Sequence, residues 1–236
     1  MRRGSVSWLR PNAGLLAVLT ANGAPAVGLL AFGTSGVGLV VFYWLEFTAL
    51  SVWALVRALF AGQPPETGGE GLGATWGDAG IPIPGTDLTV LYRTLQGLVL
   101  FVPLLAVVWV GVGGLVAGPV IAATPDAEMP PWVVVGAAAV FFTEGGRTVV
   151  EYFHRGGYRE TTVGAALKGV FLRGVVLAGV GLLVVMIADE FAEGRAVSVE
   201  AAASGPLVFA AVGVKFGIDL AAHYATERDA SLGGLI

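Results

Sequence analysis

Cysteine is absent from the sequence of 236 residues, and histidine occurs only at His154 and His223. Without cysteine the chain has no disulfide, thiolate metal site or cysteine nucleophile, and two histidines cannot form a three-histidine metal site within one chain. Charged residues are also few, 13 % of the chain, whereas a soluble domain carries about 25 %. The sequence has no run of basic residues of the kind that binds nucleic acid, so we expect no nucleic-acid partner. We also expect no bound cofactor.

The sequence is instead rich in apolar residues, since 56 % of it is hydrophobic and 36 residues are glycine. This composition is typical of a multi-pass membrane protein, in which glycine lets helices approach closely. Six apolar stretches have about 20 or more residues each, enough to cross a hydrocarbon core of about 30 Å at 1.5 Å per residue. We therefore predict an all-α, polytopic membrane protein, a single domain of six transmembrane helices in a bundle, with the lipid bilayer as its partner.

The predicted spans are residues 13–32, 36–60, 96–118, 132–153, 163–188 and 204–225, and a Gly- and Pro-rich loop covers residues 61–87. The basic start of the chain and Ala24-Pro25-Ala26 also resemble a signal peptide. We favour a kinked first helix because the apolar run resumes at Val27, but cleavage of this segment stays an alternative. The segment Leu88–Leu95 has the pattern of a short interfacial helix.

The lysine and arginine residues are distributed unevenly, and this distribution predicts the topology. With the N-terminus in the cytoplasm, the external segments hold only Arg195, and Arg147, Arg173 and Lys215 lie within spans. We therefore predict a multi-pass protein of the cell membrane. An even number of spans then places both of its termini in the cytoplasm. The cytoplasmic segments hold Arg2, Arg3, Arg10, Arg57, Arg93, Arg155, Arg159, Lys168 and Arg228.

Ionisable residues inside the spans are the main functional signal. In the last span, Lys215, Asp219 and His223 follow at intervals of four residues and therefore share one helix face. A central charge that faces lipid costs roughly 2.5–3.5 kcal/mol, so this face must meet protein or water. Depths counted at about 1.5 Å per residue place acids and bases of four helices in matching layers. The predicted polar cluster consists of Glu46, Glu144, Arg147, Arg173, Lys215, Asp219 and His223.

Mutual pairing is the simplest way to neutralise this cluster. We expect Lys215 to pair with Glu46 or Glu144, and Asp219 to pair with Arg147 or Arg173. The second, fourth, fifth and sixth spans would then surround the cluster, and the third span, which has no charge, would be peripheral.

Some residues beside the cluster are candidates for further roles. Aromatic residues and glycines next to Glu46 and Glu144 are possible pocket-lining residues, although packing is their commoner use in spans: Tyr43, Trp44, Gly145 and Gly146. No metal site is expected, because the weak candidate ligands lack a HExxH-type spacing: His154, His223, Asp219 and Glu151. Gly114 and Gly118 form a small-xxx-small pair through which a homo-oligomer or a contact with another membrane subunit can form.

Three classes of function fit these residues. We favour transport or permeation of a small solute, ion or proton, because ionisable residues inside a membrane commonly mark such pathways. A non-catalytic structural or accessory membrane subunit is the first alternative, since buried ion pairs also fix helix register. A membrane-embedded enzyme with a His, Asp and Glu site facing the cytoplasm is the second, but the pattern favours a protein without catalytic activity.

Short motifs in three spans resemble a known family. They are Tyr43-Trp44-Leu45-Glu46, Phe141-Phe142 with Gly145-Gly146, and the set Lys215, Asp219 and His223. In these motifs the chain is similar to a multi-pass membrane family of halophilic archaea and some bacteria that is catalogued as a domain of unknown function. The resemblance covers nearly the whole chain apart from the loop at residues 61–87. It implies a helical membrane bundle and brings no activity, substrate or cofactor.

Overall fold

The computed structural model describes residues 36–64, 79–86, 88–123 and 129–192, together with residues 213, 216, 217 and 220. Most of the described chain is helical. The long helices are α2 (Gly36–Leu59), α3 (Tyr92–Val112), α5 (Pro131–Arg147) and α6 (Val163–Ala192). The shorter ones are α4 (Gly118–Ala123), the π-helical turns η2 (Gly113–Ala117) and η3 (Thr148–His154), and the 3-10 turn η4 (Gly157–Glu160).

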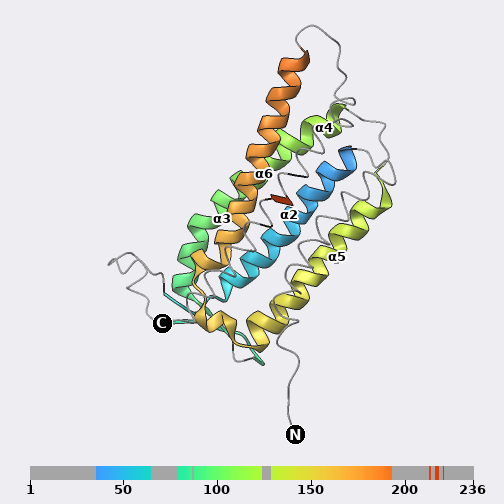
Figure 1. Cartoon of the computed structure of the whole chain (residues 1–236). Helices are drawn as coiled ribbons and strands as arrows, with labels where there is room; N and C mark the ends of the chain where they lie inside the picture. Colours follow the sequence, from blue (N-terminus) through green and yellow to red (C-terminus); the bar gives the residue numbers. More distant parts are fainter. Residues whose placement is uncertain are drawn as a thin grey trace.

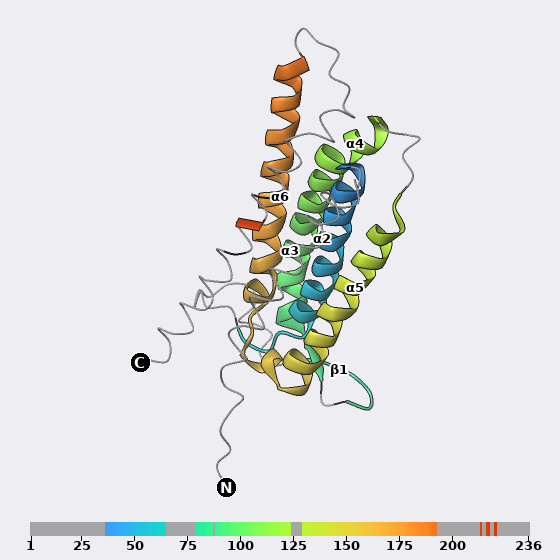
Figure 2. The ribbon, with the colours of Figure 1, turned by 45° about the vertical axis from the view of Figure 1, so that its right-hand side comes forward.

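Helix α2 lies at the centre of the described bundle. It packs against α5 on one side and against α6 and α3 on the other, as both ribbon views show (Figures 1 and 2). α2 and α5 run in one direction, and α3 and α6 run in the opposite direction (Figure 1). The end at which α2 ends and α3 and α6 begin is therefore shared by four chain segments, and we refer to it as the lower end.

Three described helical segments are long and apolar enough to cross a membrane, judged by length and composition: Gly38–Leu59, Tyr92–Val112 and Pro131–His154. They lie at the second, third and fourth predicted spans, and α6 lies at the fifth. The first predicted span, 13–32, lies outside the described residues. Of the sixth predicted span, 204–225, the structure describes only residues 213, 216, 217 and 220, and these are helical.

A small hairpin precedes α3 where the sequence predicted only a loop and an interfacial helix. Strand β1 (Gly80–Pro82) pairs antiparallel with β2 (Thr89–Leu91), and Gly80 lies opposite Leu91. Between them, Gly85 has φ +80° and the Thr86 amide donates to the Ile83 carbonyl (3.2 Å), as in a type II turn with Pro84 before the glycine. The segment 88–95 is therefore a strand followed by the first turn of α3, because pairing with β1 holds residues 89–91 extended.

The ends of the helices follow from local sequence. α5 begins with Pro131, whose missing amide hydrogen is not needed in the first turn. η3 ends before Gly156, which adopts φ +78° and reverses the chain. α6 then begins after Thr162, whose hydroxyl accepts from the Ala165 amide (3.1 Å).

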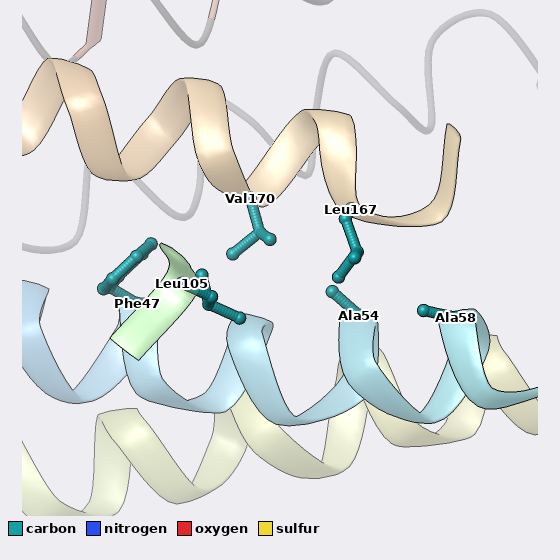
Figure 3. Close-up of a cluster of buried hydrophobic side chains, with 6 residues drawn as sticks. All are labelled: Phe47, Ala54, Ala58, Leu105, Leu167 and Val170. Carbon is teal, nitrogen blue, oxygen red and sulfur yellow. The ribbon is translucent and has the colours of Figure 1, made fainter. Parts of the chain in front are cut away.

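The main apolar core joins α2 to α3 and α6 (Figure 3). Phe47 and Ala54 of α2 meet Leu105 of α3 and Leu167 and Val170 of α6, with Ala58 one turn further along α2. Alanine on α2 lets α6 approach, so larger side chains of α6 fill the space between the helices. A second apolar cluster joins Val41 and Phe42 of α2 to Val133 of α5.

Two leucines on α6 provide a matched test of this packing. Leu167 is 0 % exposed, whereas Leu172 on the same helix is 55 % exposed. We expect Leu167→Ala to lower the free energy of unfolding by about 2–3 kcal/mol, the lower part of the range for buried leucine. Leu172→Ala should change it by less than about 0.5 kcal/mol. Thermal unfolding of the detergent-purified protein measures both, and equal losses would contradict the packing of α6 on α2.

Candidate functional site

The polar site of the described chain is built on the face of α2 that meets α5. Phe42, Glu46, Trp53 and Arg57 fall within an arc of about 60° at 100° per residue. Phe42, Trp53 and Arg57 all contact α5, so Glu46 lies on the same side of α2. Glu46 is only 9 % exposed. At about 1.5 Å per residue it lies roughly 15 Å from the start of α2, halfway across a hydrocarbon core of about 30 Å.

An ion pair closes the lower part of this α2–α5 contact. Arg57 Nη1 donates to Glu144 Oε1 (2.6 Å) and lies 3.3 Å from the Thr148 hydroxyl, to which it also donates. The Arg57 and Glu144 side chains are 24 % and 17 % exposed. At this burial a single unpaired charge would be costly, so the pair fixes the register of α2 against α5.

Neighbouring side chains complete the hydrogen bonding around this pair. The Tyr152 hydroxyl donates to the Arg57 carbonyl oxygen (2.6 Å), which belongs to the last turn of α2. The Trp53 indole donates to the Phe141 carbonyl oxygen (2.9 Å). These bonds give the Tyr152 hydroxyl and the Trp53 indole N–H acceptors within the contact between the helices, where a donor without a partner would be costly.

Gly145 makes the close approach of α2 and α5 possible. A Cβ atom at this position would overlap the Trp53 indole, whereas a Cβ atom at Gly146 would meet nothing within 4 Å. Gly145 is buried and Gly146 is exposed. Of the two glycines predicted as possible pocket residues, Gly145 therefore serves helix packing, and Gly146 lies on the outer surface of α5.

The predicted aromatic pocket residues lie elsewhere. Trp44 stacks on Trp109 of α3, with ring centroids 5.0 Å apart, and it lies on the opposite face of α2 from Trp53, because nine residues rotate the helix by about 180°. The Trp109 indole donates to the Thr48 hydroxyl (2.8 Å). Tyr43 packs beside Phe42, with centroids 5.8 Å apart. The structure therefore does not bring Trp44 and Gly145 together in one pocket.

Of the other predicted cluster residues, the structure describes Arg147 and Arg173, and both are exposed. Arg147 donates to Glu151 (3.0 Å) on the outer side of α5, with side chains 65 % and 52 % exposed. Arg173 lies on an exposed face of α6. Lys215 was expected to pair with Glu46 or Glu144, and within the described residues Glu144 pairs with Arg57. Lys215, Asp219 and His223 lie outside the described residues, so the full cluster stays a prediction.

Of the candidate metal ligands, the structure describes His154 and Glu151, both in η3. His154 is exposed at the end of η3, and Glu151 binds Arg147. Within the described ranges no three His, Cys, Asp or Glu side chains are placed to share a metal ion. The other two candidates, Asp219 and His223, lie outside those ranges.

The lower end of the bundle is held by hydrogen bonds between separate chain segments. The Gly62 amide donates to the Tyr158 carbonyl (2.7 Å), and the Gln63 amide donates to the Thr161 carbonyl (3.1 Å). Arg93 donates to the Gly62 carbonyl, and the Thr94 hydroxyl donates to that of Ala61 (3.2 Å). At the upper end, Phe42 is in ring contact with Trp132 (5.6 Å), and Val41 and Phe42 cluster with Val133.

The paired glycines test the α2–α5 contact. We expect Gly145→Val to lower the free energy of unfolding by about 1–3 kcal/mol, because the added methyl groups push Trp53 away from α5. Gly146→Val, its neighbour on the outer surface, should change it by less than about 0.5 kcal/mol. Unfolding curves followed by Trp fluorescence measure the difference. A loss at position 146 as large as at position 145 would contradict this placement of α5.

Comparison with known proteins yields one family. A sequence profile described as a family of unknown function (DUF6498) matches residues 7–232. No curated protein and no solved structure matches the chain. Since the match covers nearly the whole sequence, the chain belongs to this family of unknown function.

Proposed function

We propose that the protein is an integral membrane protein of the cell membrane with six spans and both termini in the cytoplasm. The apolar side chains on the outer faces of the described helices support this, because lipid is the solvent in which such a surface is stable. The exposed set includes Val99, Leu100, Val107, Val135, Phe142 and Leu172.

The placement of basic residues supports the orientation. Arg57 lies in the last turn of α2, Arg93 bonds to the loop that follows it, and Arg159 lies in the turn before α6. All three are at the lower end of the bundle. By the positive-inside rule this end faces the cytoplasm.

Within this framework we propose that the protein moves a small ion or a proton across the membrane. The observation that carries the proposal is Glu46, a carboxylic acid buried at mid-depth on the α5-facing side of the central helix. Acidic side chains at this depth are typical of cation and proton pathways. Glu46 is thus the proposed binding group for the transported cation.

The Arg57–Glu144 pair is then the closure on the cytoplasmic side of Glu46. It lies about 11 residues below Glu46 along α2, and its guanidinium bridges the two helices between which the ion would have to pass. The hydrogen bonds of the lower end keep these segments together. Above Glu46 the described contacts of α2 with α5 include the apolar ones of Phe42 with Val133 and Trp132, so we expect Glu46 to be reached from outside.

Cysteine labelling tests this access, since the natural chain has no cysteine to interfere. In vesicles, a membrane-impermeant thiol reagent added outside should label Glu46→Cys. Ala54→Cys is the matched control, because Ala54 is 1 % exposed in the apolar contact of α2 with α6 and should not react. Labelling of position 46 from neither side would contradict the proposed pathway.

Ion flux tests the activity itself. Vesicles that contain the protein and a pH-sensitive dye should acidify faster than protein-free vesicles when a potential draws protons inward, with sodium and potassium fluxes measured in parallel. Glu46→Gln should remove the increment, because it removes the carboxylate proposed to bind the cation. No increment for any of the three cations would contradict a role in cation movement.

A second candidate function is that of a structural or accessory membrane subunit. The specific observation that favours it is the set of bonds that joins the helices at Arg57, whose Nη1 donates to Glu144 and Thr148 and whose backbone carbonyl accepts from Tyr152. A scaffold needs such a closed network and no water path. Absence of both labelling and flux, together with a normally folded protein, would favour this function.

A further inference from the structure

The turn between α5 and α6 carries cationic side chains at the lower end of the bundle. Arg155, Arg159 and Lys168 are exposed, and within the described part of the chain none of them forms an ion pair. Glu160 is the one acidic residue between Arg155 and Lys168. We call Arg155 and Arg159, together with Lys168 in the second turn of α6, the basic turn; counted with Glu160, these residues have a formal charge of +2.

The backbone of the basic turn is fixed by the neighbouring segment. The Tyr158 carbonyl accepts from the Gly62 amide (2.7 Å). A Cβ atom at Gly62 would lie 3.0 Å from this carbonyl oxygen, so the close approach depends on glycine. The Thr161 carbonyl accepts from the Gln63 amide (3.1 Å), and the Thr161 hydroxyl donates to the Gly157 carbonyl (2.8 Å). The cations are thus presented from a preorganised backbone.

One of the three cations is also positioned by a side chain. Arg159 Nε donates to the Tyr158 hydroxyl (3.0 Å), and the guanidinium carbon lies 5.3 Å from the centre of the Tyr158 ring. This arrangement uses Nε and leaves the two terminal nitrogens of the guanidinium available. Those nitrogens are the fork with which arginine binds phosphate oxygens.

An apolar surface continues directly from the basic turn along α6. Lys168, Leu172 and Val175 are spaced at i, i+4 and i+7, so they share one face of the helix. All three are exposed. A positive charge near the membrane boundary, followed by an apolar face over roughly 10 Å of helix at 1.5 Å per residue, complements an anionic headgroup with its acyl chains.

We propose that the basic turn binds the phosphate headgroup of an anionic phospholipid of the cytoplasmic leaflet, whose acyl chains lie along Leu172 and Val175. Free phosphate or nucleic acid would contact the cations but not the apolar face, whereas a phospholipid contacts both. The proposal does not depend on ion movement through the α2–α5 contact, because none of its residues lies there.

Lipid titration of the full-length protein tests this site. Phosphatidylglycerol added to the detergent-purified protein should raise its unfolding temperature in a saturable manner, whereas phosphatidylcholine and inorganic phosphate should not. The variant Arg155→Gln/Arg159→Gln/Lys168→Gln should bind phosphatidylglycerol about 100-fold more weakly, since each basic side chain at an anionic lipid surface is worth roughly fivefold. High salt should weaken binding to the natural protein, because it screens exposed charges.

The control removes charges at the same end without changing the net charge. Arg147→Gln/Glu151→Gln deletes the exposed pair of α5 and should keep the natural affinity for phosphatidylglycerol. If the triple variant does not fold, Arg155→Lys/Arg159→Lys, which retains the charges, should bind within about threefold of the natural protein, because the charge dominates this term. Equal stabilisation by phosphatidylcholine, a response to inorganic phosphate, or unchanged binding by the triple variant would each overturn the proposal.

Discussion

The central constraint on this fold is that α2 is enclosed by other helices, so both of its faces must be matched by a neighbour. One face is apolar and small, and Ala54 and Ala58 admit Leu167 and Val170 of α6. The other face carries Glu46, Trp53 and Arg57, which cannot be left facing lipid. In the lower half of the helix, Arg57 pairs with Glu144, so its charge faces α5 and not lipid. This pairing determines the position of α5 along α2.

Both ends of the bundle have aromatic contacts, and the lower end also has hydrogen bonds between separate chain segments. Hydrogen bonds join α2, α3 and the turn before α6 at the lower end. At the upper end, Trp44 stacks on Trp109 and Phe42 packs on Trp132, and in the described part of the chain the buried indole nitrogens of Trp44 and Trp132 have no hydrogen-bond partner. Directional bonds resist separation more than ring contacts do, so the upper end is the expected side of entry to Glu46.

The sequence predicted the long helices of the described chain, because apolar runs separated by Gly, Pro and charge are strong signals. The Arg57–Glu144 pair was not among the predicted pairings, and the pairings predicted for Lys215 and Asp219 lie outside the described residues. Arg57 was placed at the cytoplasmic end of its span, and its long side chain reaches Glu144 from there. A helical projection of α2 would have shown that Glu46, Trp53 and Arg57 share one face of the helix. The π-turn that places Tyr152 against Arg57 and the hairpin before α3 depend on contacts with distant segments, which periodicity does not record.

The most direct test of this account is a charge exchange between Arg57 and Glu144. Arg57→Glu and Glu144→Arg should each lower the free energy of unfolding, because each places like charges together between α2 and α5. The double variant Arg57→Glu/Glu144→Arg should recover much of that loss, with a coupling energy of about 1–3 kcal/mol, as expected for residues in contact. If the losses of the two single variants simply add in the double variant, the two side chains do not meet, and the proposed arrangement of α2 and α5 is contradicted.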